Sequence, residues 1–215
     1  ANMLILNGQK MAKSTGNYIL PNEIFTGENN ILSKAFSPSA TRFFMMQAHY
    51  RSVLDFSNDA LEAAEKGYIK LMEALNNIDK IEVGKESSIN IGEWKQRWYD
   101  AMNDDFNSPE FIANLFEAVK YINLLVEKKE TISATDFEEL KNTINTFVFD
   151  VLGLKNDLEQ NASEKLNGVV EMLIKMRKEA RDNSDWTLSD KIRDELAVLG
   201  IQLKDGKEGT TFSIN

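Results

Sequence analysis

The stretch SPEFIANLFEAVKYINLLVEKK, residues 108–129, sets the fold class of this chain of 215 residues. It opens with Ser-Pro-Glu, which places a capping hydroxyl next to a proline in the first helical turn. The apolar residues that follow sustain about six helical turns. A helix with so much apolar surface needs other helices to cover it, so the stretch predicts a helical bundle.

Helical signals of the same kind lie on both sides of this stretch. Residues 37–52 repeat the Ser-Pro opening and place Phe43, Met46 and Tyr50 near one face. Residues 79–91 are polar and are expected to form a loop. The other helices are expected at residues 58–78, 92–107 and, up to a stop signal at Gly153, 134–154. Helices joined by short connections are typical of an antiparallel bundle.

The two ends of the chain differ from this middle part. Residues 7–18 are predicted to form a flexible loop, and a short helix is expected to begin at Pro21. At the other end, a helical hairpin over 163–199 precedes two alternating segments, IQLKD and TTFSI, which predict a β-hairpin connected by GKEG. The fold class is therefore mainly α, ending in a small α+β module.

We expect three domains in this order: the loop and its connection, the antiparallel helix bundle, and the α+β module. The polar residues 155–163 lack helical periodicity and mark the second boundary. The three domains are expected at residues 1–36, 37–160 and 161–215.

Charge and composition narrow the function classes. The net charge is −9, and residues 79–162 carry 9 basic against 17 acidic side chains, a balance of −8. Affinity for nucleic acid depends on neutralising phosphates, so any such contact is expected at the near-neutral ends. With no cysteine and one histidine, we expect no metal site and a cytoplasmic location. No apolar run is long enough to span a membrane, and no secretory signal opens the chain.

The segment KMAKSTGN, residues 10–17, is a candidate phosphate-binding loop. Lys10 and Lys13 can reach around a polyphosphate, and positioned cations stabilise charge on a transferring group. Ser14 can add a hydrogen bond, and Gly16 lets backbone amides approach an anion. The physical chemistry alone favours the alternative, an ordinary solvated turn.

This segment resembles the KMSKS signature of class I aminoacyl-tRNA synthetases, with Ala12 at the central serine position. The resemblance implies that Lys10, Met11, Lys13 and Ser14 bind ATP. Lys10 and Lys13 would be the catalytic residues, and Lys13 the main pyrophosphate contact.

Three longer segments resemble the cysteinyl-tRNA synthetases, in the order of that family. These segments are RFFMMQAHYRSVLDFS at 42–57, MNDDFNSPEFIANLFE at 102–117 and DWTLSDKIRDELAVLGIQLKDGKEGTTF at 185–212. The resemblance implies a C-terminal part of a cysteine–tRNA ligase, which activates cysteine with ATP and Mg and transfers it to tRNA(Cys). The family's HIGH motif and zinc site precede this part. We therefore expect an inactive fragment, and a monomer.

The α+β module contains the candidate anticodon-binding residues. Unpaired bases are recognised by stacking on aromatic rings and by hydrogen bonds to their edges. Trp186 and Asp190 lie four residues apart on one helix face, and a carboxylate can accept from base amino groups. Arg181 can contact phosphate, and Asp205 is expected at the hairpin turn. Alternatively, Trp186 seals a small core and Asp190 pairs with Lys191 or Arg193; the resemblance favours recognition by all four residues.

The bundle contains further polar residues with structural interpretations. Arg42, His49, Tyr50 and Arg51 lie in residues 37–52, where packing and hydrogen bonding are the expected roles. The resemblance implies a DALR-type bundle that braces the lysine loop and follows the inside of the tRNA. Residues 104–107 are expected to form a capping turn for the next helix.

Two rival functions remain open. A ligase that joins cysteine to a sugar amine would share the KMSKS-bearing core. An acidic helical interaction protein would explain the net charge of −9.

Overall fold

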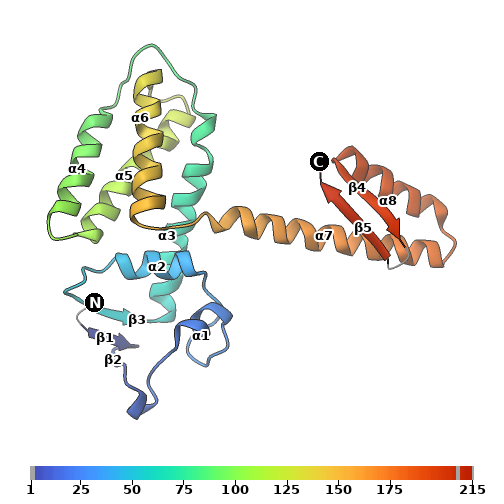
Figure 1. Ribbon diagram of the computed structural model, residues 1–215, viewed down its shortest axis with the longest axis horizontal. Helices are drawn as coiled ribbons and strands as arrows, with labels where there is room; N and C mark the ends of the chain where they lie inside the picture. Colours follow the sequence, from blue (N-terminus) through green and yellow to red (C-terminus); the bar gives the residue numbers. More distant parts are fainter. Residues whose placement is uncertain (1–2, 207–208, 215) are drawn as a thin grey trace. The chain divides into compact units, whose positions relative to one another are not determined.

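The computed structural model describes residues 3–206 and 209–214 of the chain. The chain divides into two compact units, Ala1–Leu158 and Glu159–Asn215. Helices predominate in both units (Figure 1), which confirms the mainly α class. Among the described residues, no helix has the length and apolar character needed to cross a bilayer.

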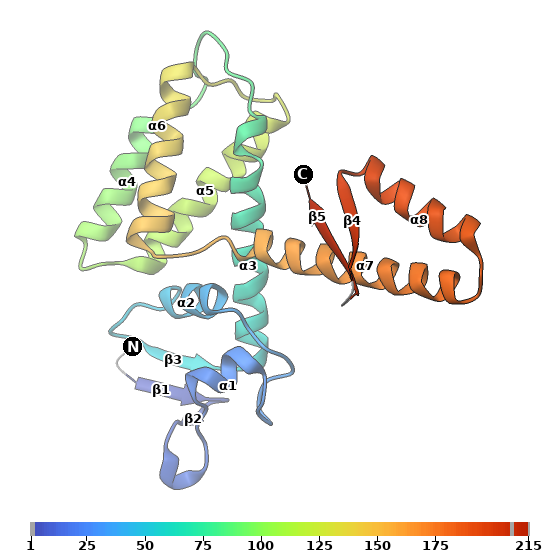
Figure 2. The same ribbon diagram turned by 45° about the vertical axis from the view of Figure 1, so that its right-hand side comes forward.

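The first unit begins with a three-stranded sheet and continues as a helical bundle, with the long α3 beside both parts (Figures 1 and 2). Its elements, in chain order, are β1 (Met3–Leu6), β2 (Gln9–Lys10), the 3-10 helix η1 (Lys13–Thr15), α1 (Pro21–Thr26), α2 (Pro38–Met46), β3 (Val53–Phe56), α3 (Asn58–Asn76), the 3-10 helix η2 (Ile78–Lys80), α4 (Ile91–Asn103), α5 (Ser108–Val126), α6 (Ala134–Ile144) and the π-helix η3 (Asn145–Val151).

The sheet has the order β2-β1-β3. β1 pairs with β2 in antiparallel fashion through a two-residue turn at Asn7–Gly8, where both residues have positive φ angles of 51° and 75°. β1 pairs with β3 in parallel, from Met3 opposite Val53 to Leu6 opposite Phe56. A parallel pair needs a crossover connection, and here α1 and α2 supply it.

Side-chain caps determine where most of the helices begin. The hydroxyls of Ser37 and Ser133 accept hydrogen bonds from the third residue of α2 and α6, at 3.1 and 3.2 Å. Asn107 caps α5 in the same way, 3.3 Å from the Glu110 amide, and Pro109 follows in the first turn. The predicted cap at Ser37 is thus confirmed; for α5, where the sequence allowed Asn107 or Ser108, the cap is Asn107 and Ser108 is the first helical residue.

Aromatic side chains fill the core of the bundle. Trp98, Phe111 and Phe147 pack with ring centroids 5.3–5.6 Å apart, and all three are buried. They join α4, α5 and η3 into one hydrophobic core, because each ring comes from a different element.

The second unit contains most of α7 (Asp157–Asp182), then α8 (Trp186–Val198), β4 (Ile201–Gly206) and β5 (Gly209–Ile214). The two strands pair in antiparallel fashion, from Ile201 opposite Ile214 to Gly206 opposite Gly209. A small core of Val170, Ile192, Leu196 and Ile201 lies between the helices and the hairpin. The predicted hairpin is confirmed; residues 207 and 208 of its GKEG connection lie outside the described residues.

Three expectations about the first unit were wrong. The helix predicted over 37–52 ends at Met46, so Tyr50 lies in a turn rather than on the face of Phe43. The strands β1 and β3 were missed. Lys10 belongs to β2 rather than to a flexible loop.

The expected linker is also different, because α7 already begins at Asp157 and runs through the polar residues that were predicted to be aperiodic. The three-domain division remains a prediction, although the pairing of β1 with β3 joins residues 1–36 to the following segment in one sheet.

Candidate functional site

The first candidate site is the segment of residues 3–18, here called the lysine hairpin. Lys10 ends β2, Met11 donates its amide to the Leu4 carbonyl at 3.2 Å, and η1 then carries Lys13 and Ser14. The side chains of Lys10, Lys13 and Ser14 are exposed, and the Lys13 Nζ lies 6.0 Å from the centroid of the Tyr18 ring. Two exposed cations therefore lie three residues apart, one at the end of β2 and one in η1, where both are accessible to an anionic ligand.

Asn17 closes the lysine hairpin, a role that the sequence reasoning missed. Its Nδ2 donates to the carbonyls of Leu6, Gln9 and Lys10 at 3.2–3.4 Å. Ala12 and Asn17 also form a backbone bridge, with a 2.9 Å hydrogen bond from the Ala12 amide. These bonds fix the segment that carries both lysines.

The lysine hairpin is also tied to β3. The Gly8 amide donates to both carboxylate oxygens of Asp55, at 3.2 and 3.1 Å. Asn-Gly between two apolar or alternating segments is a strong hairpin signal. The dipeptide Asn7–Gly8 could therefore have located this hairpin from sequence.

Met11 differs from the two lysines of this segment because it is partly buried. It packs against the core of the first unit, whereas Lys10 and Lys13 on either side are exposed. Gly16 has φ 71°, and this left-handed conformation explains a glycine there.

The second candidate site is a network around Asp205, at the end of β4. The buried Arg177 donates to both carboxylate oxygens, at 2.9 and 3.0 Å. Arg181 donates at 3.1 Å and the Thr210 hydroxyl at 2.7 Å. We call these four residues the Asp205 network.

Hydrogen bonds from Arg177 and Thr210 hold the pKa of the Asp205 carboxyl well below its usual range. Asp205 raises the pKa of the Arg177 guanidinium in turn. The carboxylate thus stays ionised with both oxygens engaged, and it holds Arg181 at the surface of the second unit.

Trp186 and Asp190 lie near the start of α8. Trp186 is the first helical residue after the cap Asp185 and is 59% exposed, so it does not seal the core of the second unit. Asp190 pairs with Arg193, 3.0 Å away on the same helix, as one alternative predicted. Arg181 and Asp205 come together; within the described residues, no hydrogen bond or ion pair links Trp186 or Asp190 to them.

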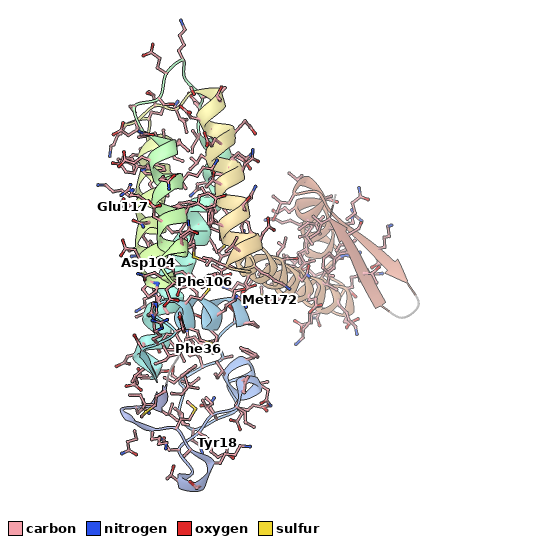
Figure 3. The ribbon with its side chains drawn as sticks, turned by 60° about the vertical axis from the view of Figure 1, so that its left-hand side comes forward. Tyr18, Phe36, Asp104, Phe106, Glu117 and Met172 are labelled. Atoms are coloured by element: carbon pink, nitrogen blue, oxygen red, sulfur yellow. The ribbon has the colours of Figure 1, made fainter. Side chains whose placement is uncertain are left out.

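A third polar cluster joins the turn after α2 to the turn between α4 and α5. The Tyr50 hydroxyl donates to Asp105 at 2.7 Å, and Arg51 pairs with the same carboxylate at 2.9 Å. This hydrogen bond raises the pKa of Tyr50. Asp105 and the exposed Phe106 both have φ angles of 54°. Phe106 is labelled beside Asp104 in Figure 3. The cluster braces two turns, which agrees with the expected hydrogen-bonding role of Tyr50.

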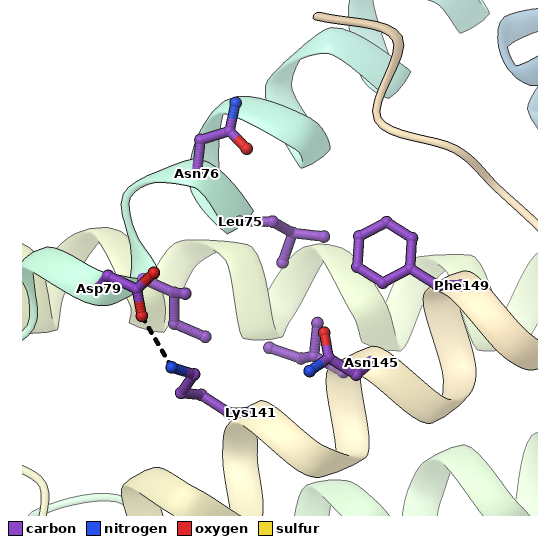
Figure 4. A pocket seen from close by; sticks show the side chains of 8 residues that line it. Leu75, Asn76, Asp79, Lys141, Asn145 and Phe149 are labelled. Atoms are coloured by element: carbon purple, nitrogen blue, oxygen red, sulfur yellow. Dashed lines mark hydrogen bonds and ion pairs between the residues drawn. The ribbon is translucent and has the colours of Figure 1, made fainter. Parts of the chain in front are cut away.

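A pocket of about 310 Å³ lies between the end of α3 and η3 (Figure 4). The ion pair between Asp79 and Lys141, 2.8 Å apart, lies in its wall and raises the pKa of Lys141. None of the predicted site residues lines this pocket. Among the described residues there is also no group of three or more acidic or histidine side chains suited to a metal ion.

Comparison with known proteins shows which class of enzyme this chain resembles. The family model for the class I (C) tRNA synthetase catalytic domain matches residues 1–66, and the DALR domain model matches residues 97–157. Both matched segments are thus similar to class I aminoacyl-tRNA synthetases.

The curated relatives of this chain indicate which amino acid the similar synthetases use. Over the whole chain, the cysteine–tRNA ligases of Bacteroides fragilis and Porphyromonas gingivalis are each 45% identical, and that of Phocaeicola vulgatus is 48% identical. Over its whole length, the chain is therefore similar to cysteine–tRNA ligases. It spans 44% of the length of each of these relatives.

Proposed function

We propose that this chain is the C-terminal part of a cysteine–tRNA ligase. The complete protein would activate cysteine with ATP and transfer it to tRNA(Cys). The family of its relatives supports this assignment, and so does the lysine hairpin, which exposes Lys10 at the end of β2 and Lys13 in η1. The HIGH motif and the zinc site of the family would belong to the remainder of the complete protein. The proposed location is the cytoplasm.

In this proposal the lysine hairpin stabilises the transition state of adenylation. Lys10 and Lys13 would contact the phosphates of ATP and offset the charge that develops on pyrophosphate. Ser14 would add a hydrogen bond. Positioned donors of this kind contribute about 100-fold to 1,000-fold in rate.

The second unit would read the anticodon. The exposure of Trp186 supports this part of the proposal most strongly. Its side chain is 59% exposed at the start of α8, so the ring is available for base stacking. Asp190 would accept from a base edge after leaving Arg193. Arg181 would contact phosphate or base while Asp205 holds it in position, since both oxygens of Asp205 are already engaged.

Binding of tRNA transcripts tests the anticodon proposal. The chain should bind tRNA(Cys) with a GCA anticodon more tightly than a transcript with an altered anticodon, measured by fluorescence anisotropy at 50 mM salt. Replacing Trp186 with Ala should weaken the first complex by about 1–3 kcal/mol and largely remove the difference. The matched control is Val198→Ala, 87% exposed on the same helix. Equal affinity of the unaltered chain for both transcripts would refute anticodon reading.

ATP–pyrophosphate exchange tests the first part of the proposal. The chain alone should show none, because the rest of the catalytic domain is needed. In a complete protein that carries this chain, Lys13→Ala should lower the exchange rate by about 100-fold or more. Lys34→Ala, outside the lysine hairpin, should leave the rate unchanged. Exchange by the chain alone would contradict the assignment.

A further inference from the structure

A half-open apolar groove of about 340 Å³ lies between the sheet, α1 and α2. Leu4 and Phe56 contribute from the strands, Phe25 from α1, and Met45 from α2. Every residue that lines the groove lies within residues 1–66, the part matched by the class I catalytic domain model.

The rim of this groove exposes large apolar side chains. Leu4, Phe25 and Met45 are 41%, 40% and 45% exposed. In contrast, the bundle helices α3, α5 and α6 present no exposed large hydrophobic side chain among their described residues. The exposed rim therefore distinguishes the groove from these three helices, although Tyr99 of α4, Phe106 and Val151 of η3 also expose large apolar side chains in the first unit.

Thr41 supplies a second sign that the groove is incomplete. This residue of α2 lines the groove and is 2% exposed. Its hydroxyl has no hydrogen-bond partner within the described part of the chain. A buried polar group without a partner costs free energy. Because this hydroxyl oxygen is itself buried, an acceptor could reach it and stabilise this region only if the groove opens around Thr41 on docking.

We propose that the groove is the docking site for an apolar segment of the remaining catalytic domain, which would also supply an acceptor for Thr41. This proposal rests on the proposed function. More than half of the length of the curated relatives has no counterpart in this chain, which spans 44% of them. Under the proposed function, the complete protein would supply further chain of the class I catalytic domain next to residues 1–66.

Docking would also position the catalytic lysines. Met11 lines the groove and lies between Lys10, which ends β2, and Lys13, which begins η1. A segment seated against Met11 would fix this part of the lysine hairpin from the apolar side while the lysines face the nucleotide. Met11 is thus a positioning residue in this proposal, in place of the direct ATP contact that the family resemblance implies.

The first test uses the chain by itself. If the groove serves a docked segment, Phe25→Glu with Met45→Glu should shift the melting temperature by no more than about 2 °C, because the rim is not part of the chain's own core. The double variant should also reduce the fluorescence of added anilinonaphthalene sulfonate severalfold. A fall of more than about 5 °C would overturn the proposal. Self-association of the chain that the double variant abolishes would assign the groove to a second copy instead.

The second test uses a full-length chimera with the catalytic part of the Bacteroides fragilis relative before this chain. Since the chain has no cysteine, Phe25→Cys, Met45→Cys and Val198→Cys each introduce one thiol into it. Labelling by N-ethylmaleimide, followed by peptide mass spectrometry, should be at least tenfold slower in the chimera than in the free chain at positions 25 and 45. The rate at position 198 should be unchanged.

Aminoacylation by the chimera is scored separately. An active chimera whose thiols at positions 25 and 45 react at the free-chain rate would overturn docking and leave the proposed function intact. Protected thiols in a chimera that cannot aminoacylate tRNA(Cys) would support docking and count against the function. If the chimera does not fold, the melting and self-association measurements on the chain by itself decide whether the groove is a docking site.

Discussion

Asp205 is the most heavily engaged side chain of the second unit. It accepts four hydrogen bonds, two of them from the buried Arg177. A carboxylate so engaged contributes to recognition through the residue it positions, Arg181, rather than by exchanging its partners for a base. Asp190 is the better candidate for direct contact, because its one ion pair lies on an exposed helix face.

Replacing Asp205 with Asn should destabilise the second unit by about 2 kcal/mol. The variant leaves the buried Arg177 charge without its counter-charge, but Asp205 is itself about half exposed, so the loss is below that of a fully buried pair. Hydrogen exchange of the α8 and hairpin amides measures it. Asp190→Asn is the matched control and should change stability by less than about 0.5 kcal/mol. Equal effects of the two substitutions would contradict a structural role for Asp205.

The same network makes the second unit sensitive to acid. Because the pKa of Asp205 is lowered in the folded state, the unfolded state takes up the proton first as pH falls. The Asp205 carboxylate stabilises the folded second unit fully above its pKa in the unfolded state, about 4. This stabilisation is lost progressively as the pH falls below that value. The difference in unfolding free energy between the unaltered chain and Asp205→Asn should therefore shrink below pH 4 in urea titrations. A difference that stays constant from pH 7 to pH 3 would refute this linkage.

At the scale of elements, Asn17 determines how firmly the lysine hairpin is closed. Asn17→Ala removes three side-chain hydrogen bonds and should raise the exchange rate of the Ala12 and Gly16 amides about tenfold. Ser14→Ala is the control, since no hydrogen bond of its hydroxyl occurs within the described residues. Unchanged exchange in the Asn17 variant would mean that the backbone alone holds the turn.

The turn after η3 requires Gly153. Its φ is 62°, and an added Cβ would lie 3.2 Å from the guanidinium of Arg42, which donates to the Leu152 carbonyl at 2.5 Å. Gly153→Ala should cost about 1–2 kcal/mol in urea unfolding of the first unit. Gly168→Ala should instead be neutral or stabilising, because Gly168 lies in α7 with open space around its Cβ position. The reverse order would disprove this account.

The helices could be predicted from sequence because their signals are local. Ser37 and Asn107 cap helices through residues three positions away, so a short window contains the whole interaction. β1 and β3 each have four residues, and their pairing depends on partners far along the chain. The extent of α7 was misjudged for a related reason, since polar residues 157–163 can extend a helix whose apolar stripe lies further on.

The candidate sites were predicted as residues but not as arrangements. Short sequence motifs were enough to select four candidate residues, all of them exposed: Lys10, Lys13, Trp186 and Asp190. Sequence reasoning missed Arg177, which makes the bidentate contact with Asp205 from 28 positions away. A buried arginine in a mixed helical pattern resembles a surface arginine, so only tertiary structure identifies it.

At the scale of the whole molecule, the two units have separate hydrophobic cores. Calorimetry of the chain should therefore resolve two unfolding transitions, and a chain truncated after Leu158 should retain the transition of the first unit within about 2 °C. In a tRNA-binding assay, the truncated chain should show no preference for the GCA anticodon, because it lacks the second unit. One cooperative transition, lost on truncation, would contradict two independent units.

The parallel pairing of β1 with β3 has a consequence for how the chain matures on the ribosome. Met3 faces Val53, so β1 leaves the ribosome long before its partner is synthesised. At about 5–20 residues per second, this interval lasts several seconds, during which β1 has one paired edge at most. The lysine hairpin reaches its final anchorage on Asp55 only after α1 and α2 have emerged. A chaperone that binds the nascent chain should therefore act on this segment before any other part of the first unit.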